Sequence, residues 1–234
     1  MRILVTRPRE DGAALAERLV RAGHEVIHAP VMDILYADGP ILDLHTYDAV
    51  LVTSANGARA LARRTLRRDV PVLAVGAATA AVATELGFTH VTASGGDVTA
   101  LVNTVCQHLP AGTALLHVAG SVTAGDLQGD LAARGYKVDR VVVYEARAVQ
   151  ALDAVAQSAL RQGVDVALFY SPRTARLFVA LVCDAHLQDT TRAVTAAGLS
   201  RAVTDALQSL PWRRIVTATE PAEAALLRAA GIAT

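Results

Sequence analysis

The strongest constraint on the fold is that the chain contains two pairs of similar segments. Segment 2–33 resembles segment 114–145, with Gly23 aligned on Gly135. The second pair is matched in two stretches. Stretch 49–61 resembles 167–179, and stretch 70–88 resembles 192–210. We call segments 2–33 and 114–145 units A and A′. The stretches within 49–88 form unit B, and those within 167–210 form unit B′. In chain order the units run A, B, A′, B′. This order predicts two similar lobes and directs the search for function to the cleft between them.

Short apolar and β-branched runs alternate with helical stretches along the chain. Such alternation predicts parallel sheets covered by helices. With 53% hydrophobic but only 4% aromatic residues, the cores must consist mainly of Ala, Val and Leu. Four helical stretches are followed by a glycine, where a positive φ ends a helix easily: Gly23, Gly87, Gly135 and Gly231. Ten strands are expected, at 3–6, 26–31, 49–53, 72–75, 90–93, 114–118, 138–144, 166–170, 193–197 and 214–218.

The repeat order allows two divisions of these strands into lobes. A with B followed by A′ with B′ would give two consecutive domains, whereas A with B′ and B with A′ would insert one domain into the other. The extended segments 32–48 and 144–149 follow the two A strands at equivalent positions, which favours a two-stranded ladder and insertion. We therefore expect an α/β protein with two flavodoxin-like lobes, each on a five-stranded parallel sheet. One lobe is 1–35 plus 150–234, and the inserted lobe, a circular permutant, is 38–144.

Charge and hydropathy exclude several classes of protein. With 22 basic and 22 acidic residues the net charge is zero, so nothing favours a nucleic acid or an anionic membrane as partner. No apolar run reaches membrane-spanning length, and the chain passes from Met1 into a strand pattern without a signal region. The basic run 63–68 is interpreted as a solvated helix end. These features predict a cytoplasmic monomer that binds a small molecule.

The usual cofactor and metal motifs are missing from the sequence. It has no GxGxxG or GxxxxGK[ST] phosphate loop, no HExxH or CxxC pattern and no GxSxG nucleophile elbow. The seven histidines have no ligand spacing, and His117, within an expected strand, is interpreted as a satisfied core or edge residue. We therefore expect no cofactor and no metal.

The expected strands end in loops of small, hydroxyl-bearing or basic residues that lead into helices. Open parallel sheets bind ligands outside the carboxyl ends of their strands, where helix N-termini favour anions. Each loop alone has a simpler explanation, since Ser54, Ser171 and Thr79 suit N-caps that contribute about 1 kcal/mol each. Together the loops predict a site for a large ligand with several anionic groups, lined by Arg7, Thr53, Ser54, Ala55, Gly76, Thr79, Gly120, Ser121, Ser171, Arg173, Gly198, Ser200 and Arg201.

A set of short motifs, taken in order, resembles a known family. The motifs are ILVTRP, GHEVIHAPV, VLVTSANGARAL, VLAVGAATAAVATELGF, HVAG, GYKVDRVVVYEA, ALFYSPRTARLF and TATEPAEAALL. Their order is similar to that of uroporphyrinogen-III synthases over essentially the whole chain. The resemblance implies two flavodoxin-like lobes joined by a two-stranded ladder. It also implies an enzyme that closes hydroxymethylbilane into uroporphyrinogen III, with loss of water, inversion of the last ring and no cofactor.

The resemblance further implies which residue is catalytic. Tyr144, in the motif VYEA, matches a family tyrosine suited to assist departure of the substrate hydroxyl. The alternative interpretation is that Tyr144 is an amphipathic tyrosine at a strand end, with its hydroxyl merely solvated. One loop departs from the family pattern, because Arg201 stands three residues after Gly198 where many members have Thr. Either Ser200 takes over the hydroxyl contact or Arg201 meets a carboxylate directly. The matching loop of the other lobe keeps its hydroxyl, at Thr79.

Two other functions fit the same repeats. A cytoplasmic two-lobe binding protein for an anionic metabolite would have the same loops, but it would have no need for Tyr144. A two-lobe glycosyltransferase would also place its site between α/β lobes, although no nucleotide-sugar signature stands near the last helices. Product analysis with hydroxymethylbilane distinguishes the three.

Overall fold

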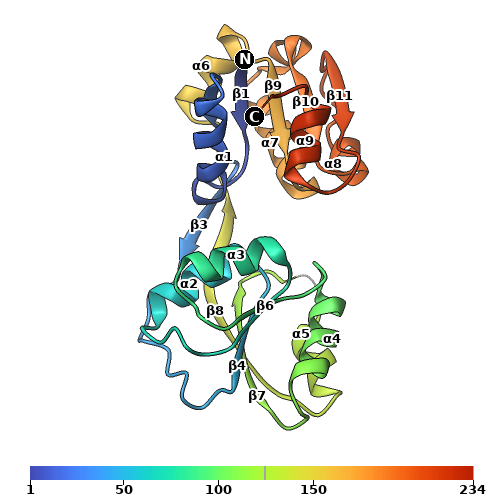
Figure 1. The fold of residues 1–234 in the computed structure, drawn as a ribbon. Coiled ribbons are helices and arrows are strands. Elements are labelled where there is room, and N and C mark those ends of the chain that lie inside the picture. The colour runs from blue at the N-terminus through green and yellow to red at the C-terminus, as the bar shows by residue number, and fades with distance from the viewer. Residues whose placement is uncertain (124, 234) are drawn as a thin grey trace. The chain divides into compact units, whose positions relative to one another are not determined.

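The computed structural model describes residues 1–123 and 125–233. They form two compact units, Met1–Asp33 with Arg147–Thr234 and Ile34–Ala146 (Figure 1). The chain passes from one unit to the other twice, in strands β3 (Met32–Tyr36) and β8 (Lys137–Ala148).

The first unit is built on a five-stranded parallel sheet. Its strands are β1 (Arg2–Val5), β2 (Glu25–His28), β9 (Val166–Phe169), β10 (Thr195–Gly198) and β11 (Arg214–Thr217). They lie in the order β11-β10-β9-β1-β2, which is the flavodoxin-like order. Val5 is aligned with both His28 and Leu168 in the parallel register. The loops that follow β1, β2 and β9 therefore leave the sheet at one edge.

Helices cover both faces of this sheet. They are α1 (Arg9–Arg21), α6 (Ala154–Gln162), α7 (Pro172–Asp184), α8 (Arg201–Asp205) and α9 (Glu223–Ala229), with a 3-10 helix at Gln188–Ala193. Strand residues alternate between two cores: Ile3 packs with α1 and α9, whereas Leu4 packs with α6, α7 and α8. The second core includes Phe169 and Phe178, whose rings meet edge to face at 5.2 Å.

The second unit contains a six-stranded sheet. Besides β3 and β8 its strands are β4 (Ala49–Val52), β5 (Val72–Ala74), β6 (Val91–Ala93) and β7 (Ala114–Gly120). They lie in the order β3-β8-β7-β4-β5-β6, so β8 to β6 repeat the order of the first sheet in permuted form. β3, which the sequence predicts only as part of the connector, pairs with β8 and makes this sheet mixed. The sheet therefore has one strand more than predicted.

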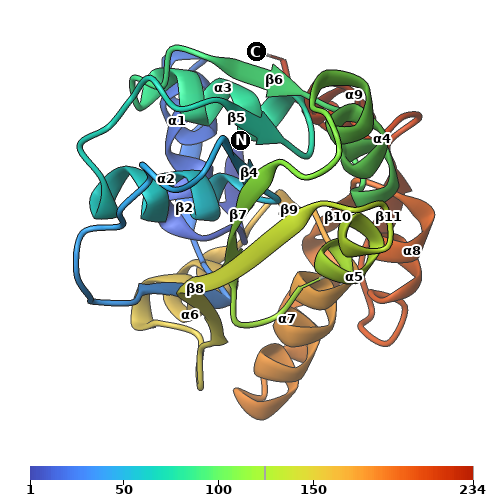
Figure 2. The same ribbon diagram turned by 90° about the horizontal axis from the view of Figure 1, so that it is seen from below.

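Two helical layers cover the second sheet as well. The helices are α2 (Ala55–Arg64), α3 (Ala77–Glu85), α4 (Val98–His108) and α5 (Leu127–Ala132). α2 and α3 pack on one face around Leu61, and α4 and α5 pack on the other around Leu101 (Figures 1 and 2). Because both faces are covered, the central strand β4 is buried along its length.

Most helix ends follow from single residues. All four predicted stop glycines have positive φ, at 84° for Gly23, 93° for Gly87, 84° for Gly135 and 71° for Gly231. Ser54 and Ser171 are confirmed as N-caps, since they accept the N–H groups of Gly57 and Thr174. Thr79 is wrong as an N-cap: it lies inside α3, whose N-cap is Gly76. The strand predicted at 193–197 begins late, at Thr195, because Gln188–Ala193 form the 3-10 helix.

Candidate active site

The hydroxyl groups of Tyr144 and Ser54 meet beside the carboxyl edge of the second sheet. Oη of Tyr144 lies 2.8 Å from Oγ of Ser54, and either atom can donate the hydrogen bond. Ser54 follows β4 and caps α2, where its Oγ accepts the N–H of Gly57 at 3.0 Å. A hydroxyl that accepts from a helix N-terminus is polarised and becomes a better donor. Ser54 is therefore suited to donate to the phenol oxygen. Thr53 precedes it in the loop, and Ala55 follows it as the first residue of α2.

Two more of the predicted residues, Gly120 and Ser121, lie next to Tyr144. Gly120 ends β7, and a Cβ there would lie 2.7 Å from Cζ of the Tyr144 ring. The Ser121 N–H donates to the Tyr144 carbonyl at 2.9 Å. The structure thus brings the catalytic candidate, which lies within β8, together with three predicted binding residues at the ends of β4 and β7.

The loop after β5 places its residues differently. Gly76 has an extended backbone, but a Cβ there would lie 3.1 Å from Cα of Gly96. Close approach of two backbones therefore favours glycine at this position. Thr79 is only 7% exposed within α3.

In the first unit the predicted residue Arg7 belongs to a cluster of charges and a ring. Its guanidinium carbon lies 4.5 Å from the centre of the Tyr170 ring, at the end of β9. Nη1 of Arg7 is 3.5 Å from Glu223, whose other oxygen is 2.8 Å from Arg18. Burial and then the charge of Glu223 raise the pKa of Tyr170, so its phenol stays protonated. Sequence reasoning missed Tyr170 and Glu223, although both lie in recognised motifs, ALFYSPRT and TEPAEAALL.

Ser171 and Arg173 lie where the loop after β9 leads into α7. Oγ of Ser171 caps α7 and also lies 2.8 Å from Oγ1 of Thr174. Thr174 is buried, whereas Arg173 is exposed on the first turn of the helix. The start of α7 thus offers one engaged hydroxyl and one exposed cation at the sheet edge.

The loop after β10 contains the departure from the family pattern. A Cβ at Gly198 would lie 2.6 Å from Cγ2 of Thr204, a residue that sequence reasoning missed. Oγ1 of Thr204 lies 3.1 Å from Oγ1 of Thr217. Ser200 makes no side-chain capping bond to α8, and Arg201 is highly exposed and pairs with Asp205 at 2.9 Å.

A comparison with protein-family models identifies the chain. The model described as uroporphyrinogen-III synthase HemD matches residues 13–228. The chain belongs to the uroporphyrinogen-III synthase family. It is an enzyme that cyclises hydroxymethylbilane to uroporphyrinogen III with loss of water and inversion of the last ring. The family match does not favour the binding-protein alternative.

A solved structure of a uroporphyrinogen-III synthase has a similar fold, and a second one was also matched. The enzyme from Helicobacter pylori 26695 matches with a TM-score of 0.63 and 18% identity, over 97% of each chain. A mutant enzyme from Thermus thermophilus is 20% identical over 97% of this chain and 96% of its own, with a TM-score of 0.49. The comparison with curated proteins returned no match.

In this synthase the basic run 63–68 is not the solvated helix end that the sequence predicts. Arg64 donates to the carbonyls of Pro40 and Ala37, and Arg67 donates to that of Leu44. Arg68 binds four carbonyls, those of Ala62, Thr65, Arg67 and Leu86. These arginines hold the 37–44 segment against the end of α2. Their guanidinium groups donate to carbonyls that have no hydrogen-bond partner within the helix.

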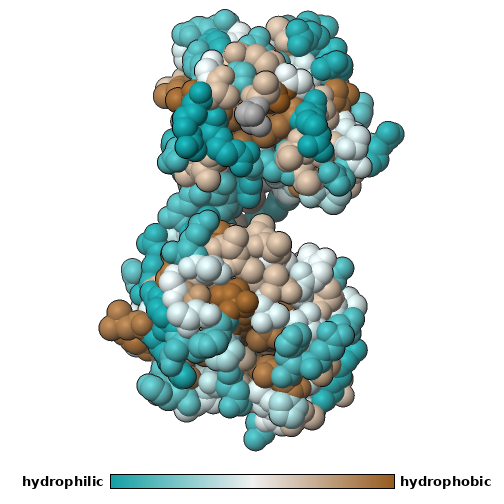
Figure 3. All heavy atoms as spheres, viewed as in Figure 1, coloured by the Kyte–Doolittle hydropathy of each residue, from teal (hydrophilic) through white to brown (hydrophobic). Residues whose placement is uncertain are grey.

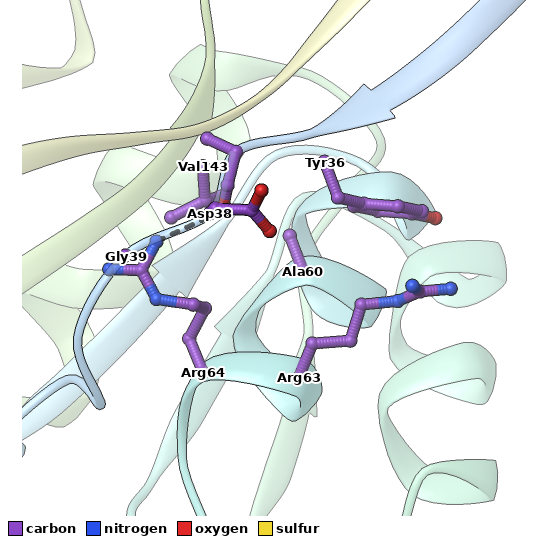
Figure 4. A pocket seen from close by; sticks show the side chains of 8 residues that line it. Tyr36, Asp38, Gly39, Ala60, Arg63, Arg64 and Val143 are labelled. Atoms are coloured by element: carbon purple, nitrogen blue, oxygen red, sulfur yellow. Dashed lines mark hydrogen bonds between the residues drawn. The ribbon is translucent and has the colours of Figure 1, made fainter.

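A pocket of about 260 Å³ lies beside this basic run (Figure 4). Arg63 lies 4.0 Å from the centre of the Tyr36 ring, and Arg64 and Asp38 also line the space. None of the predicted site residues lines this pocket.

On the face shown in Figure 3, hydrophobic surface is divided into separate patches among hydrophilic residues. Within residues 1–123 and 125–233, no helix is long and apolar enough to cross a membrane.

Proposed function

We propose that Tyr144 assists the loss of the hydroxyl group from hydroxymethylbilane and that loops at the carboxyl edges of both sheets bind the substrate's carboxylates. The observation that supports the first part is the 2.8 Å contact between the hydroxyls of Tyr144 and Ser54. A phenol beside a polarised hydroxyl is a suitable proton donor for a leaving oxygen.

In the proposed first step the C–O bond of the hydroxymethyl group breaks and its electron pair leaves with the oxygen. The phenol of Tyr144 donates a proton, so the leaving group departs as water. The pyrrole nitrogen lone pair stabilises the azafulvene cation that remains. To invert the last ring, the cationic carbon first bonds to the ring carbon that already carries the bridge to the rest of the chain. That bridge bond then breaks, and the bridge carbon bonds to the free α-carbon of the same ring. The α-carbon loses its proton when aromaticity returns, and this proton restores the phenol. The reaction thus balances with loss of one water.

Ser54 supports this step through the oxygen of Tyr144. As the phenol gives up its proton, negative charge develops on Oη, and a hydrogen bond from Ser54 stabilises that charge. Ser54 is fixed for this role because its own oxygen is held by the Gly57 N–H. A donor already in place needs no reorganisation during the reaction.

Substrate binding needs many anion contacts, because hydroxymethylbilane carries eight carboxylates. The loops that begin α1, α2, α3, α7 and α8 supply helix N-termini, and Arg7 and Arg173 supply guanidinium groups. Of the two candidates after β10, we favour Ser200, because its side chain makes no capping bond whereas Arg201 is paired with Asp205. With the substrate held at many points, positioning accounts for most of the catalysis.

The decisive experiment is incubation with freshly prepared hydroxymethylbilane, followed by oxidation and identification of the porphyrin isomer. We expect the type III isomer from the native protein. Tyr144→Phe should lower kcat by about 10²-fold or less, the bottom of the range for general acid assistance, because the leaving group needs little help. Tyr47→Phe is the matched control, since Tyr47 binds Asp139 in the same unit. An unchanged rate in Tyr144→Phe would remove this residue from the mechanism.

We further propose that the enzyme is a cytoplasmic monomer. The net charge of zero supports the cytoplasmic part of this proposal, because it gives the chain no general attraction to an anionic membrane or a polyanion. Light scattering during gel filtration gives the mass in solution, and a mass of two chains would contradict the monomer. Fractionation of cells would test the compartment.

A further inference from the structure

We propose that a β-bulge in β8, together with Gly120 and Arg140, positions Tyr144 against Ser54. In this role Gly120 is a positioning residue and does not bind substrate. The inference rests on the proposed catalytic function of Tyr144, and its test is arranged so that the two can fail separately.

The bulge is visible in the pairing of β7 with β8. Ala119 pairs with Val142, but the next residue, Gly120, pairs with Tyr144. Val143 is therefore an extra residue on β8. A bulge of this kind re-aims the side chains that follow it, and bulges are common beside active sites.

The extra residue decides which face of the sheet receives Tyr144. Val141 and Val143 pack in the core under α2 and α3, while Val142 between them is 43% exposed. Regular alternation would send the next side chain to the same face as Val142. Tyr144 instead packs in the same core as Val143. Because Ser54 begins α2 on that face, the bulge brings the phenol to it.

Gly120 provides the space for the ring. A Cβ at this position would lie 2.7 Å from Cζ and 2.9 Å from Oη of Tyr144. Gly120 is not among the glycines with positive φ, so its backbone suits any residue. Space alone therefore requires glycine here. The clashing atoms are at the far end of a movable side chain, so a methyl group would displace the phenol and leave the strands paired.

Arg140 holds the strand end from the other face. Its Nη2 donates to the carbonyl of Gly120 at 2.8 Å. Arg140 is opposite His117 in the register, three residues before the bulge. The Ser121 N–H binds the Tyr144 carbonyl at 2.9 Å on the far side of the bulge. These two bonds fix the backbone on both sides of the glycine, so the ring keeps one direction.

The test separates positioning from substrate binding by kinetics. If Gly120 positions Tyr144, Gly120→Ala should lower kcat to within about twofold of Tyr144→Phe and leave KM nearly unchanged. The double variant Gly120→Ala/Tyr144→Phe should be no slower than the slower single variant. A contact with substrate would instead raise KM and add to the loss from Tyr144→Phe.

Stability gives a second readout that does not depend on activity. Gly120→Ala should lower Tm when Tyr144 is present, and the shift should fall by more than half in a Tyr144→Ala background, where the ring is missing. Arg140→Ala should lower kcat in the same direction as Gly120→Ala. Arg134→Ala is its matched control, because Arg134 also donates to a carbonyl, that of Asp130, at 2.6 Å. We expect no change in kcat for this control.

Two results would overturn the inference. One is full activity of folded Gly120→Ala while Tyr144→Phe is slow, which leaves the proposed function intact. The other is an equal Tm shift for Gly120→Ala with and without the ring. If Tyr144→Phe is as fast as the native protein, the proposed function fails instead, whatever the Tm shifts show.

Discussion

The guanidinium of Arg7 lies over the ring of Tyr170, with 4.5 Å between the guanidinium carbon and the ring centre. The two residues follow β1 and β9, which are neighbours in the first sheet. An arginine stacked on an aromatic ring keeps its N–H groups directed outward in the guanidinium plane. We propose that Tyr170 is a platform that orients Arg7 for a substrate carboxylate.

The first prediction removes this platform. Tyr170→Leu should raise KM for hydroxymethylbilane, because Arg7 loses a cation–π contact of about 0.5–2 kcal/mol. Since 1.4 kcal/mol is a factor of ten, the increase should be about 2- to 30-fold, with little change in kcat. Tyr170→Phe keeps the ring and should behave like the native enzyme. A large increase of KM in Tyr170→Phe would assign the effect to the hydroxyl.

The second prediction concerns the arginines themselves. Arg7→Ala and Arg173→Ala should each weaken substrate use modestly, because substrate carboxylates are shared among many loops. A charge-assisted hydrogen bond contributes about 1.5–3 kcal/mol when well made, and less where water reaches it. The measurement is kcat/KM of each folded variant. Complete inactivity of either one would show that a single arginine dominates binding.

The third prediction concerns Glu223, which places a carboxylate beside Arg7. Glu223→Gln should lower KM by about two- to threefold, because a half-exposed ion pair of this kind contributes up to about 1 kcal/mol and competes with substrate. The ion pair is 3.5 Å long, so little orientation of Arg7 is lost. Glu220→Gln, which affects the exposed pair with Arg228, is the matched control. A higher KM in Glu223→Gln would show that Glu223 orients Arg7.

The fourth prediction is a pH dependence of stability from His117. This ring is 2% exposed, and neither nitrogen has a hydrogen-bond partner among the described residues. Burial, with the charge of Arg140, lowers the pKa of His117 from 6.5 to about 4. The folded protein therefore disfavours the imidazolium. The contribution of neutral His117 to the free energy of unfolding is fully present above pH 6.5. It is lost as the pH drops toward 4, by up to about 3 kcal/mol at 1.36 kcal/mol per pH unit.

Urea melts between pH 7 and pH 4 would measure this loss. His117→Leu should flatten the dependence over that range, because an apolar side chain does not titrate. Replacement of the exposed His45 by Ala is the control and should leave the slope unchanged. An equal slope in His117→Leu and the native protein would assign the pH dependence to other groups.

The fifth prediction tests the inserted-domain organisation. A fragment of Ala37–Glu145 should unfold cooperatively, because it keeps β4 to β7 and most of β8 together. A fragment of Met1–Val118 should not, because it separates β1 from β9 and removes β8. Denaturant melts of both fragments decide the question. Cooperative unfolding of the second fragment alone would support two consecutive domains.

The sequence predicts the parts of the fold that depend on local patterns. Strand and helix alternation, the stop glycines and the caps at Ser54 and Ser171 each depend on a few neighbouring residues. The bulge at Val143 was not predictable in this way, because the sequence VVVY looks like a regular strand and the register depends on β7. The sixth strand β3 was missed for a similar reason, since its pairing with β8 joins residues far apart in the chain.

The same distinction applies to the candidate site. The motif VYEA predicts Tyr144 by resemblance, but its contact with Ser54 joins residues 90 positions apart. Glu223 meets Arg7 across 216 positions. Such contacts depend on how β4, β8, β1 and α9 pack, and no spacing in the sequence encodes them. The arginines of the 63–68 run were misread because their carbonyl partners lie partly in the 37–44 segment.

The central place of β1 in its sheet sets an order of events during synthesis. β1 lies between β2 and β9, and Ile3, Leu4 and Val5 are fully buried there. All of Ile34–Ala146 leaves the ribosome before Val166–Phe169 does. The inserted unit can therefore fold while β1 still has an open hydrogen-bonding edge and an uncovered apolar face. The first residues of the nascent chain are thus the ones exposed longest to misassembly.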